Sequence, residues 1–162
     1  MITAGDRVPS VPVKLVTAAE TTNSDTAAIL GQGLVVLFAV PGAYTPTCDT
    51  SHLPGFVANA SKIKALGVTR IVCATANDHF VTKAWAERSD ALNSIDFIAD
   101  QHAMFAEALG LAKEFADLGK RYARFAMILR DGIVADVFVQ DVAGVTVSGA
   151  PAILLALQGM SA

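Results

Sequence analysis

The cysteine at position 48 is the residue whose type and position most strongly suggest chemistry. It closes the segment Pro41-Gly42-Ala43-Tyr44-Thr45-Pro46-Thr47-Cys48 and falls at the expected first turn of a helix. Unpaired backbone N–H groups and the positive end of the helix dipole converge at such a turn, and both favour a thiolate over a thiol. Because the thiolate is the nucleophilic form of cysteine, the sequence predicts a reactive Cys48.

Two elements are expected to hold Cys48 in this place. Residues 34–40 form a short, nearly continuous apolar run that indicates a buried strand of a parallel or mixed sheet, and a Pro-Gly pair ends it. Apolar residues then recur with helical spacing from Cys48 to Leu66, although Pro54 and Gly55 should disturb the first turns. The thiol is therefore expected where the chain passes from a core strand into a helix.

A helix end alone does not account for a thiolate at neutral pH. The dipole contributes about 0.3 to 2 kcal/mol, and a charge-assisted hydrogen bond from the Thr45 hydroxyl contributes about 1.5 to 3 kcal/mol. We therefore expect a cation beside the sulfur. Arg124 is the first candidate, because it opens a predicted core strand and should point toward a cleft edge, and Arg121 is the second. Asp49 acts in the opposite sense, since its carboxylate repels an anion on the adjacent residue.

These residues resemble the active-site segment of the peroxiredoxins, specifically their type II or peroxiredoxin-5-like branch. The resemblance rests on residues 41–48 followed by His52-Leu53-Pro54-Gly55-Phe56, with Tyr44 where the family usually has phenylalanine. It covers most of the chain through further segments: Asn77-Asp78-His79-Phe80 with Trp85, and Arg124-Phe125-Ala126-Met127 with Asp131-Gly132.

The resemblance implies an α/β, thioredoxin-like fold with a mixed central sheet flanked by helices, and thiol-dependent reduction of hydrogen peroxide and alkyl hydroperoxides. It implies that Cys48 is the peroxidatic cysteine and Arg124 the active-site arginine. By the same resemblance Thr45 orients thiolate and peroxide, and Pro41 shields the site from water. The thiolate attacks one peroxide oxygen and displaces the other, which leaves a sulfenic acid on Cys48. During this attack, fixed hydrogen-bond donors stabilise the charge that develops on the leaving oxygen. No cofactor is expected, and the preferred peroxide is left open.

The reductant depends on what resolves that sulfenic acid. In some relatives a C-terminal cysteine does so, but the corresponding region, residues 145–151, has none. Cys73 lies inside a predicted core strand and could bridge only if the Cys48 helix unwound, so we interpret it as structural while its participation stays open. The resemblance implies an external donor: glutathione with glutaredoxin, or thioredoxin.

His52 admits more than one interpretation. It lies one helical turn beyond Cys48 and could act as a base, but a thiolate that is already formed needs none. The family resemblance instead places this residue near a dimer contact.

Two other functions compete with the peroxidase. Cys48-Asp49-Thr50-Ser51 has the C-x-x-S form of monothiol glutaredoxin-like disulfide oxidoreductases, although the preceding Thr-Pro-Thr argues against that class. A non-enzymatic peroxide sensor would need the same reactive thiol.

Composition narrows the remaining classes. The 162 residues, 53% hydrophobic and 17% charged, suit a single domain, 1–162, that hides apolar surface in a homodimer. The net charge of −3 without a basic stripe argues against nucleic acid, and scattered Cys and His residues argue against a metal. No apolar run is long enough to span a membrane and the first residues do not resemble a signal peptide, so we expect a cytoplasmic protein.

The remaining elements are expected as follows. Residues 11–16 should form an edge strand, and residues 111–119 are ambiguous between helix and structured loop. A helix over 79–91 should pack Phe80, Ala84 and Trp85 inward. Further elements are strands at 69–75, 95–98, 123–129 and 133–139, the last two joined by an Asp-Gly turn, and helices at 28–30, 103–109 and 149–157.

Overall fold

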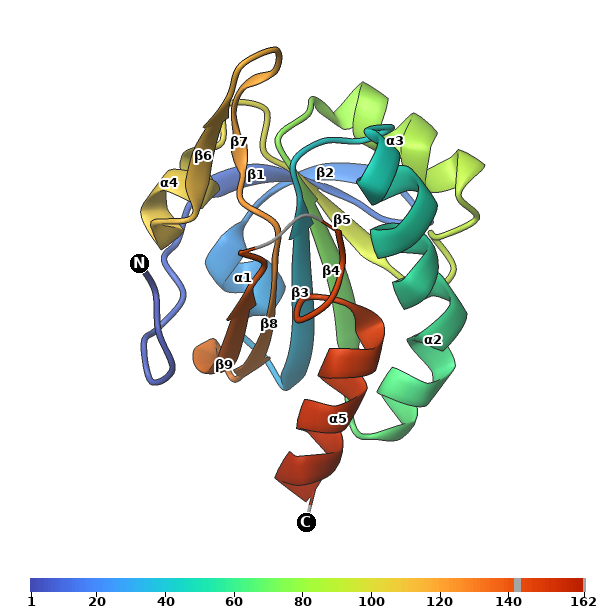
Figure 1. The fold of residues 1–162 in the computed structure, drawn as a ribbon, viewed down its shortest axis with the longest axis vertical. Coiled ribbons are helices and arrows are strands. Elements are labelled where there is room, and N and C mark those ends of the chain that lie inside the picture. The colour runs from blue at the N-terminus through green and yellow to red at the C-terminus, as the bar shows by residue number, and fades with distance from the viewer. Residues whose placement is uncertain (142–143, 162) are drawn as a thin grey trace.

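The chain folds around a seven-stranded mixed sheet, shown in Figure 1 by a computed structural model that describes residues 1–141 and 144–161. The strands of this sheet are β1 (Pro12–Val16), β2 (Thr21–Asp25), β3 (Leu34–Val40), β4 (Arg70–Thr75), β5 (Asp96–Ala99), β8 (Phe125–Arg130) and β9 (Ile133–Val139). Their order is β2-β1-β5-β4-β3-β8-β9. The pairs β3 with β4 and β4 with β5 are parallel, and the other neighbours are antiparallel. A separate hairpin joins β6 (Ala112–Phe115) to β7 (Gly119–Tyr122).

Helices cover both faces of the sheet (Figure 1). They are α1 (Thr26–Leu30), a π-helical turn η1 (Cys48–His52) that continues into α2 (Leu53–Ala65), α3 (His79–Arg88), α4 (Met104–Leu109) and α5 (Ala150–Ser161). Buried residues of α2, α3 and α5 share one apolar core, and those of α1 and α4 share a second core on the other face.

Strand β3 lies between the two cores, and all seven of its residues are buried. Successive side chains of a strand point to opposite faces. Val36, Phe38 and Val40 accordingly enter the core with α2, while Val35 and Leu37 enter the other. This double burial explains why the segment is continuously apolar, as predicted for a central strand.

The topology brings the predicted site residues to one end of the central strands. Strands β3 and β4 run parallel, so their last residues, Val40 and Thr75, lie at the same end of the sheet. Strand β8 runs the other way, and its first residue, Phe125, pairs with Ala39 near the end of β3. Arg124, just before Phe125, therefore lies where β3 leads into the Cys48 segment.

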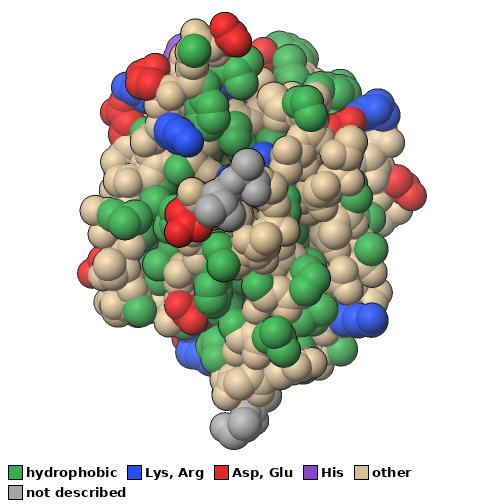
Figure 2. Space-filling view, viewed as in Figure 1, with side chains coloured by type: hydrophobic (Ala, Val, Ile, Leu, Met, Phe, Trp, Pro, Cys, Tyr) green, Lys and Arg blue, Asp and Glu red, His purple; other side chains and the backbone are tan. Residues whose placement is uncertain are grey.

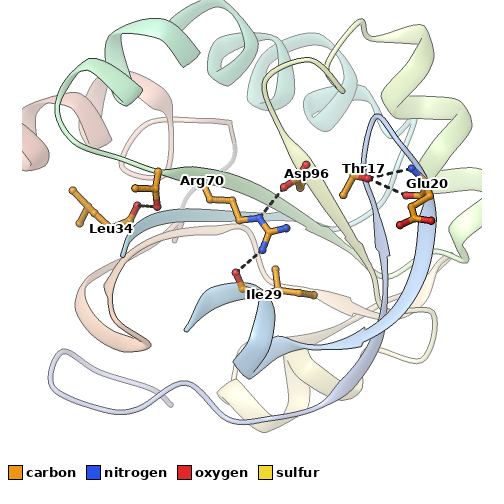
Figure 3. Close-up of polar contacts among 7 residues, drawn as sticks. Thr17, Glu20, Ile29, Leu34, Arg70 and Asp96 are labelled. Carbon is orange, nitrogen blue, oxygen red and sulfur yellow. Dashed lines mark hydrogen bonds and ion pairs between the residues drawn. The ribbon is translucent and has the colours of Figure 1, made fainter. Parts of the chain in front are cut away.

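At the opposite end of these strands, Arg70 at the start of β4 connects neighbouring elements (Figure 3). Its Nε donates to Asp96 Oδ2 over 2.7 Å, and its Nη1 donates to the Ile29 carbonyl over 2.9 Å. One side chain thus joins β4, β5 and α1 on the side away from Cys48.

Three expectations need correction. Strand β1 is not at the edge, because the unpredicted polar strand β2 covers it. The ambiguous segment after Leu111 is the β6–β7 hairpin. Helix α3 buries Thr82, Trp85 and Ala86, whereas Phe80 is 74% exposed and Ala84 is also exposed.

Candidate active site

Cys48 begins the π-helical turn, and its side chain is fully buried. The Leu53 N–H donates to the Cys48 carbonyl, a bond that spans five residues instead of four. The next residue, Pro54, has no N–H and cannot make the usual helical bond. The disturbance expected from the proline therefore takes the form of a widened turn that carries the thiol.

Two donors contact the Cys48 sulfur. The Thr45 hydroxyl lies 2.7 Å from Sγ, and the Arg124 Nη2 donates to Sγ over 3.1 Å. Thr45 is three residues away in sequence and Arg124 is 76 residues away. The structure thus brings together three of the four residues that the sequence proposed, one of them located just before the distant strand β8.

Pro41, the fourth, is buried directly after β3. Its place in the chain is compatible with shielding the site from water, which stays a prediction.

Arg121, the second candidate cation, forms hydrogen bonds with two backbone carbonyls near the site. Its Nη1 donates to the Ala76 carbonyl over 3.2 Å and its Nε to the Leu118 carbonyl over 3.1 Å. A Cβ on Gly42 would lie only 3.0 Å from Arg121 Nη1, so this close approach favours glycine. Arg121 joins the β6–β7 hairpin to the loop that precedes α3.

Asp49 is turned toward α3. Its carboxylate accepts a hydrogen bond from Trp85 Nε1 over 2.9 Å and forms an ion pair with Arg88. The hydrogen bonds from Arg88 and Trp85 lower the pKa of Asp49. The negative charge that we expected to oppose a thiolate is thus paired, and the same contacts tie the Cys48 turn to α3.

His52, the last residue of η1, was assigned by sequence to a dimer contact or, less favourably, to base catalysis. In the structure it is buried inside the chain, with 1% of its surface exposed. Its ring nitrogens contact Arg124 Nη1 and the Ser148 carbonyl, each over 2.8 Å. Sequence spacing gave no signal for either partner.

Cys73 lies in β4, opposite Phe38 of β3, and is fully buried. Burial raises the pKa of the Cys73 thiol well above its usual value, and the neighbouring Cys48 raises it further, while Arg124 acts in the opposite direction. Both cysteines are free. A protonated, enclosed Cys73 suits the structural role proposed for it.

Two kinds of feature are absent from the described part of the chain. Residues 1–141 and 144–161 contain no cluster of three or more Cys, His, Asp or Glu side chains that could hold a metal ion. Over the same residues, no helix combines the length and apolar character needed to cross a membrane.

Comparison with known proteins gives the class. The redoxin family model matches residues 3–154. Peroxiredoxin-2D of Arabidopsis thaliana is 37% identical over 159 residues, which span 96% of this chain and 98% of the plant protein. The structure of reduced Prx3 from Vibrio vulnificus in complex with H2O2 superposes with a TM-score of 0.91 at 39% identity, covering 97% of this chain and 99% of the other. Peroxiredoxin 5 from Alvinella pompejana superposes with a TM-score of 0.85 at 27% identity, with 98% and 99% covered.

These matches define a thiol-dependent peroxidase with a thioredoxin-like fold. They confirm the fold and the peroxidase activity that the sequence predicted. The chain belongs to the peroxiredoxins, in their type II or peroxiredoxin-5-like branch. The glutaredoxin-like and sensor interpretations are therefore set aside.

Proposed function

We propose that this peroxidase reduces hydrogen peroxide and alkyl hydroperoxides at Cys48, with Thr45 and Arg124 as the catalytic partners and Pro41 as a shield against water. The observation that carries the proposal is the Cys48 sulfur itself. It is buried, and a hydroxyl and a guanidinium both contact it. Neither partner is needed to pack an inert thiol, whereas both are suited to an anion and to a polar substrate.

The proposed reaction begins with attack of the Cys48 thiolate on one peroxide oxygen. An S–O bond forms as the O–O bond breaks, and the leaving oxygen takes the electron pair and then a proton, giving water or an alcohol. Arg124 stands beside the sulfur where it can stabilise the charge on that oxygen, and such fixed donors act mainly on the transition state. Cys48 is left as a sulfenic acid.

We further propose an external thiol, supplied by glutathione with glutaredoxin or by thioredoxin, as the reductant. The donor sulfur attacks the Cys48 sulfenic acid, which releases water and leaves a mixed disulfide that a second thiol reduces. Because Cys48 has no exposed surface in this conformation, any substrate needs the site to open before it can contact the sulfur, and a bulky thiol donor needs the η1 turn itself to open. Cys73 is held inside the sheet, which supports an external donor over an internal one.

We propose a homodimer and a cytoplasmic location as well. Apolar side chains are exposed around the site: Tyr44 in the segment that leads to Cys48, Phe80 and Val81 at the start of α3, and Leu118 at the tip of the β6–β7 hairpin. A partner chain that covers them would remove this apolar surface from water. Two free cysteines suit a reducing compartment.

The test separates the peroxide step from the reductant step. Trp85 is the single tryptophan, and its indole donates to Asp49 next to Cys48, so its fluorescence can follow oxidation after rapid mixing with peroxide. We expect a rapid signal in the wild type and in Cys73→Ser, and none in Cys48→Ser. A rapid signal in Cys48→Ser would contradict the assignment of Cys48.

Turnover of the same proteins is then measured with glutathione plus glutaredoxin and, separately, with thioredoxin. We expect Cys73→Ser to keep most of its activity with the preferred donor. Near-complete loss in that variant would make Cys73 a resolving residue.

A further inference from the structure

His52 is enclosed on all sides by the site and the core beneath it. Its ring lies 5.1 Å from the Phe38 ring and 5.6 Å from the Phe56 ring, measured between centroids. A buried polar ring must find partners for its nitrogens, and both are filled: Nε2 by the Ser148 carbonyl and Nδ1 by Arg124 Nη1.

These partners fix the state of the imidazole. A carbonyl oxygen only accepts, so Nε2 carries the proton, and a guanidinium only donates, so Nδ1 offers its lone pair. Burial is the main reason that the pKa of His52 is lowered to about 3; the hydrogen bond to the Ser148 carbonyl opposes this shift, and the charge of Arg124 contributes to it. The ring is therefore neutral at working pH, and with both nitrogens engaged it has no free lone pair with which to act as a base.

Arg124 is consequently held at both ends of its guanidinium. Nη1 donates to His52 and Nη2 donates to the Cys48 sulfur over 3.1 Å. Because a buried acceptor already fixes the orientation of this long, flexible side chain, the side chain loses less conformational entropy when it interacts with a transition state.

The turn before α5 is attached to the same arginine by a second route. The Gln140 N–H donates to the Arg124 carbonyl over 2.9 Å. The Gln140 Oε1 accepts from the Thr146 N–H over 2.9 Å and from the Ser148 hydroxyl over 3.0 Å. Gln140 thus shapes the turn whose Ser148 carbonyl accepts the hydrogen bond from His52 Nε2–H.

We propose that His52 is a positioning residue, which uses the Ser148 carbonyl as its anchor and holds the Arg124 guanidinium on the Cys48 sulfur. The proposal rests on the proposed roles of Cys48 and Arg124. It makes the turn before α5 part of the support of the active site, although that turn lies about 100 residues along the chain from Cys48.

Two substitutions separate the contacts of His52. His52→Asn places an amide oxygen near the position of Nδ1 and can still accept from Arg124. His52→Gln places an amide near the position of Nε2 and can still donate to Ser148, but it leaves Arg124 without its acceptor. We expect His52→Gln to lose about tenfold in the rate of Cys48 oxidation and to need a higher pH for thiolate absorbance, because its cation is less well held. His52→Asn should lose much less of either.

Three controls make the result decisive. Phe105→Leu weakens the core on the other sheet face and should change neither the rate nor the pH profile. Arg124→Met should lose most of the rate, and adding His52→Gln to it should cost nothing more, because the two residues act as one unit.

The outcomes fall into distinct groups. If Arg124→Met oxidises as fast as the wild type, the proposed role of Arg124 is wrong. If Arg124→Met is slow but His52→Gln keeps the wild-type rate and pH profile, or loses as much rate in the Arg124→Met background as in the wild type, the positioning role of His52 is wrong.

Discussion

The Thr45 hydroxyl has one proton and two acceptors within reach. It lies 2.7 Å from the Cys48 sulfur and 2.8 Å from the Gly42 carbonyl oxygen. When Cys48 is a thiol, the S–H can donate to Thr45 while the hydroxyl donates to Gly42. When Cys48 is a thiolate, the hydroxyl can turn to the sulfur. Thr45 can therefore form a hydrogen bond with Cys48 in both of its protonation states, the thiol and the thiolate.

Replacing Thr45 with valine tests this exchange. Valine keeps the shape of the side chain but removes the proton, so the thiolate loses one of its two donors. We expect the rate of Cys48 oxidation to fall by about 100-fold, as for the loss of one transition-state donor. Stopped-flow Trp85 fluorescence measures the rate. Thr45→Ser, which keeps the hydroxyl, should stay much closer to the wild type, and an equal loss in both variants would assign the effect to packing.

His52 should make the fold sensitive to acid. The unfolded chain protonates His52 below about pH 6.5, whereas the folded chain keeps it neutral down to about pH 3. Its contribution to stability is therefore complete above pH 6.5 and is lost as the pH falls toward 3. Between pH 6 and pH 4 we expect a loss of about 2 to 3 kcal/mol from this residue.

Denaturant unfolding of the wild type and of His52→Asn at several pH values measures this contribution. Carboxylates titrate in the same range in both proteins, so the difference between the two slopes isolates the histidine. Parallel slopes would contradict the neutral, buried assignment.

At this scale the sequence identified the residues that touch the sulfur but not those that support them. Thr45 lies near Cys48 in the chain. The position of Arg124 at the start of a core strand indicated that its side chain points toward a cleft edge. The partnership of His52 with Ser148 joins residues 96 apart and depends on how a turn folds, which no local pattern encodes. What the sequence did offer was a histidine inside an apolar helical stripe.

Among the elements, the η1 turn is the one that must both hold the thiol and release it. Asp49 ties this turn to α3 through Trp85 and Arg88, and Arg88 also lies over the Tyr44 ring, 4.9 Å from its centroid. Arg88 thus contacts the chain on both sides of Cys48. We expect this tether to stabilise the closed turn and to oppose the opening that the proposed bulky donor requires.

Asp49→Asn should loosen this tether without removing it. The amide oxygen can still accept from Trp85, but the charge that pairs with Arg88 is gone. We expect a bulky maleimide to alkylate Cys48 a few-fold faster, because the closed turn is less favoured. The reaction is followed by mass spectrometry under native conditions, with Cys73 as the internal buried thiol.

Glu87→Gln is the matched control for Asp49→Asn. Glu87 pairs with Lys83 over 3.9 Å on the exposed side of α3, away from the turn. This variant removes one acidic charge from the same region and should leave the alkylation rate unchanged. Equal acceleration in both variants would show that net charge, and not the tether, sets the rate.

The sequence predicted elements best where burial is continuous or a turn has special chemistry. Strand β3 was found over its full length, and Asp131 and Gly132 adopt the positive φ values, 51° and 80°, that the hairpin turn requires. Strand β2 was missed because its residues, TTNSD, are polar and form an edge. Phe80 was placed inside because of its type, but the buried hydrogen bond between the hydroxyls of Thr82 and Thr75, a residue of β4, turns another face of α3 toward the sheet.

At the scale of the whole molecule, the apolar surface is concentrated at more than one place. The end that carries the site exposes Phe80, and hydrogen bonds of Arg121 bring the hairpin tip at Leu118 toward the loop before α3. On the face shown in Figure 2, apolar side chains also gather over α5, where Leu155 is 71% exposed. The two surfaces predict different modes of association, and only the first would cover the rim of the active site.

Phe80→Asp tests the dimer that we propose through the site end. A charge in the centre of an apolar interface is left unpaired and desolvated, so the variant should be monomeric at concentrations where the wild type is dimeric. Leu155→Asp is the matched control, because it introduces the same charge at an equally exposed apolar residue of α5 and should stay dimeric. Sedimentation velocity over a dilution series measures both. If Leu155→Asp dissociates and Phe80→Asp does not, the partner covers α5 and leaves the mouth of the site open; a monomeric wild type would remove the dimer altogether.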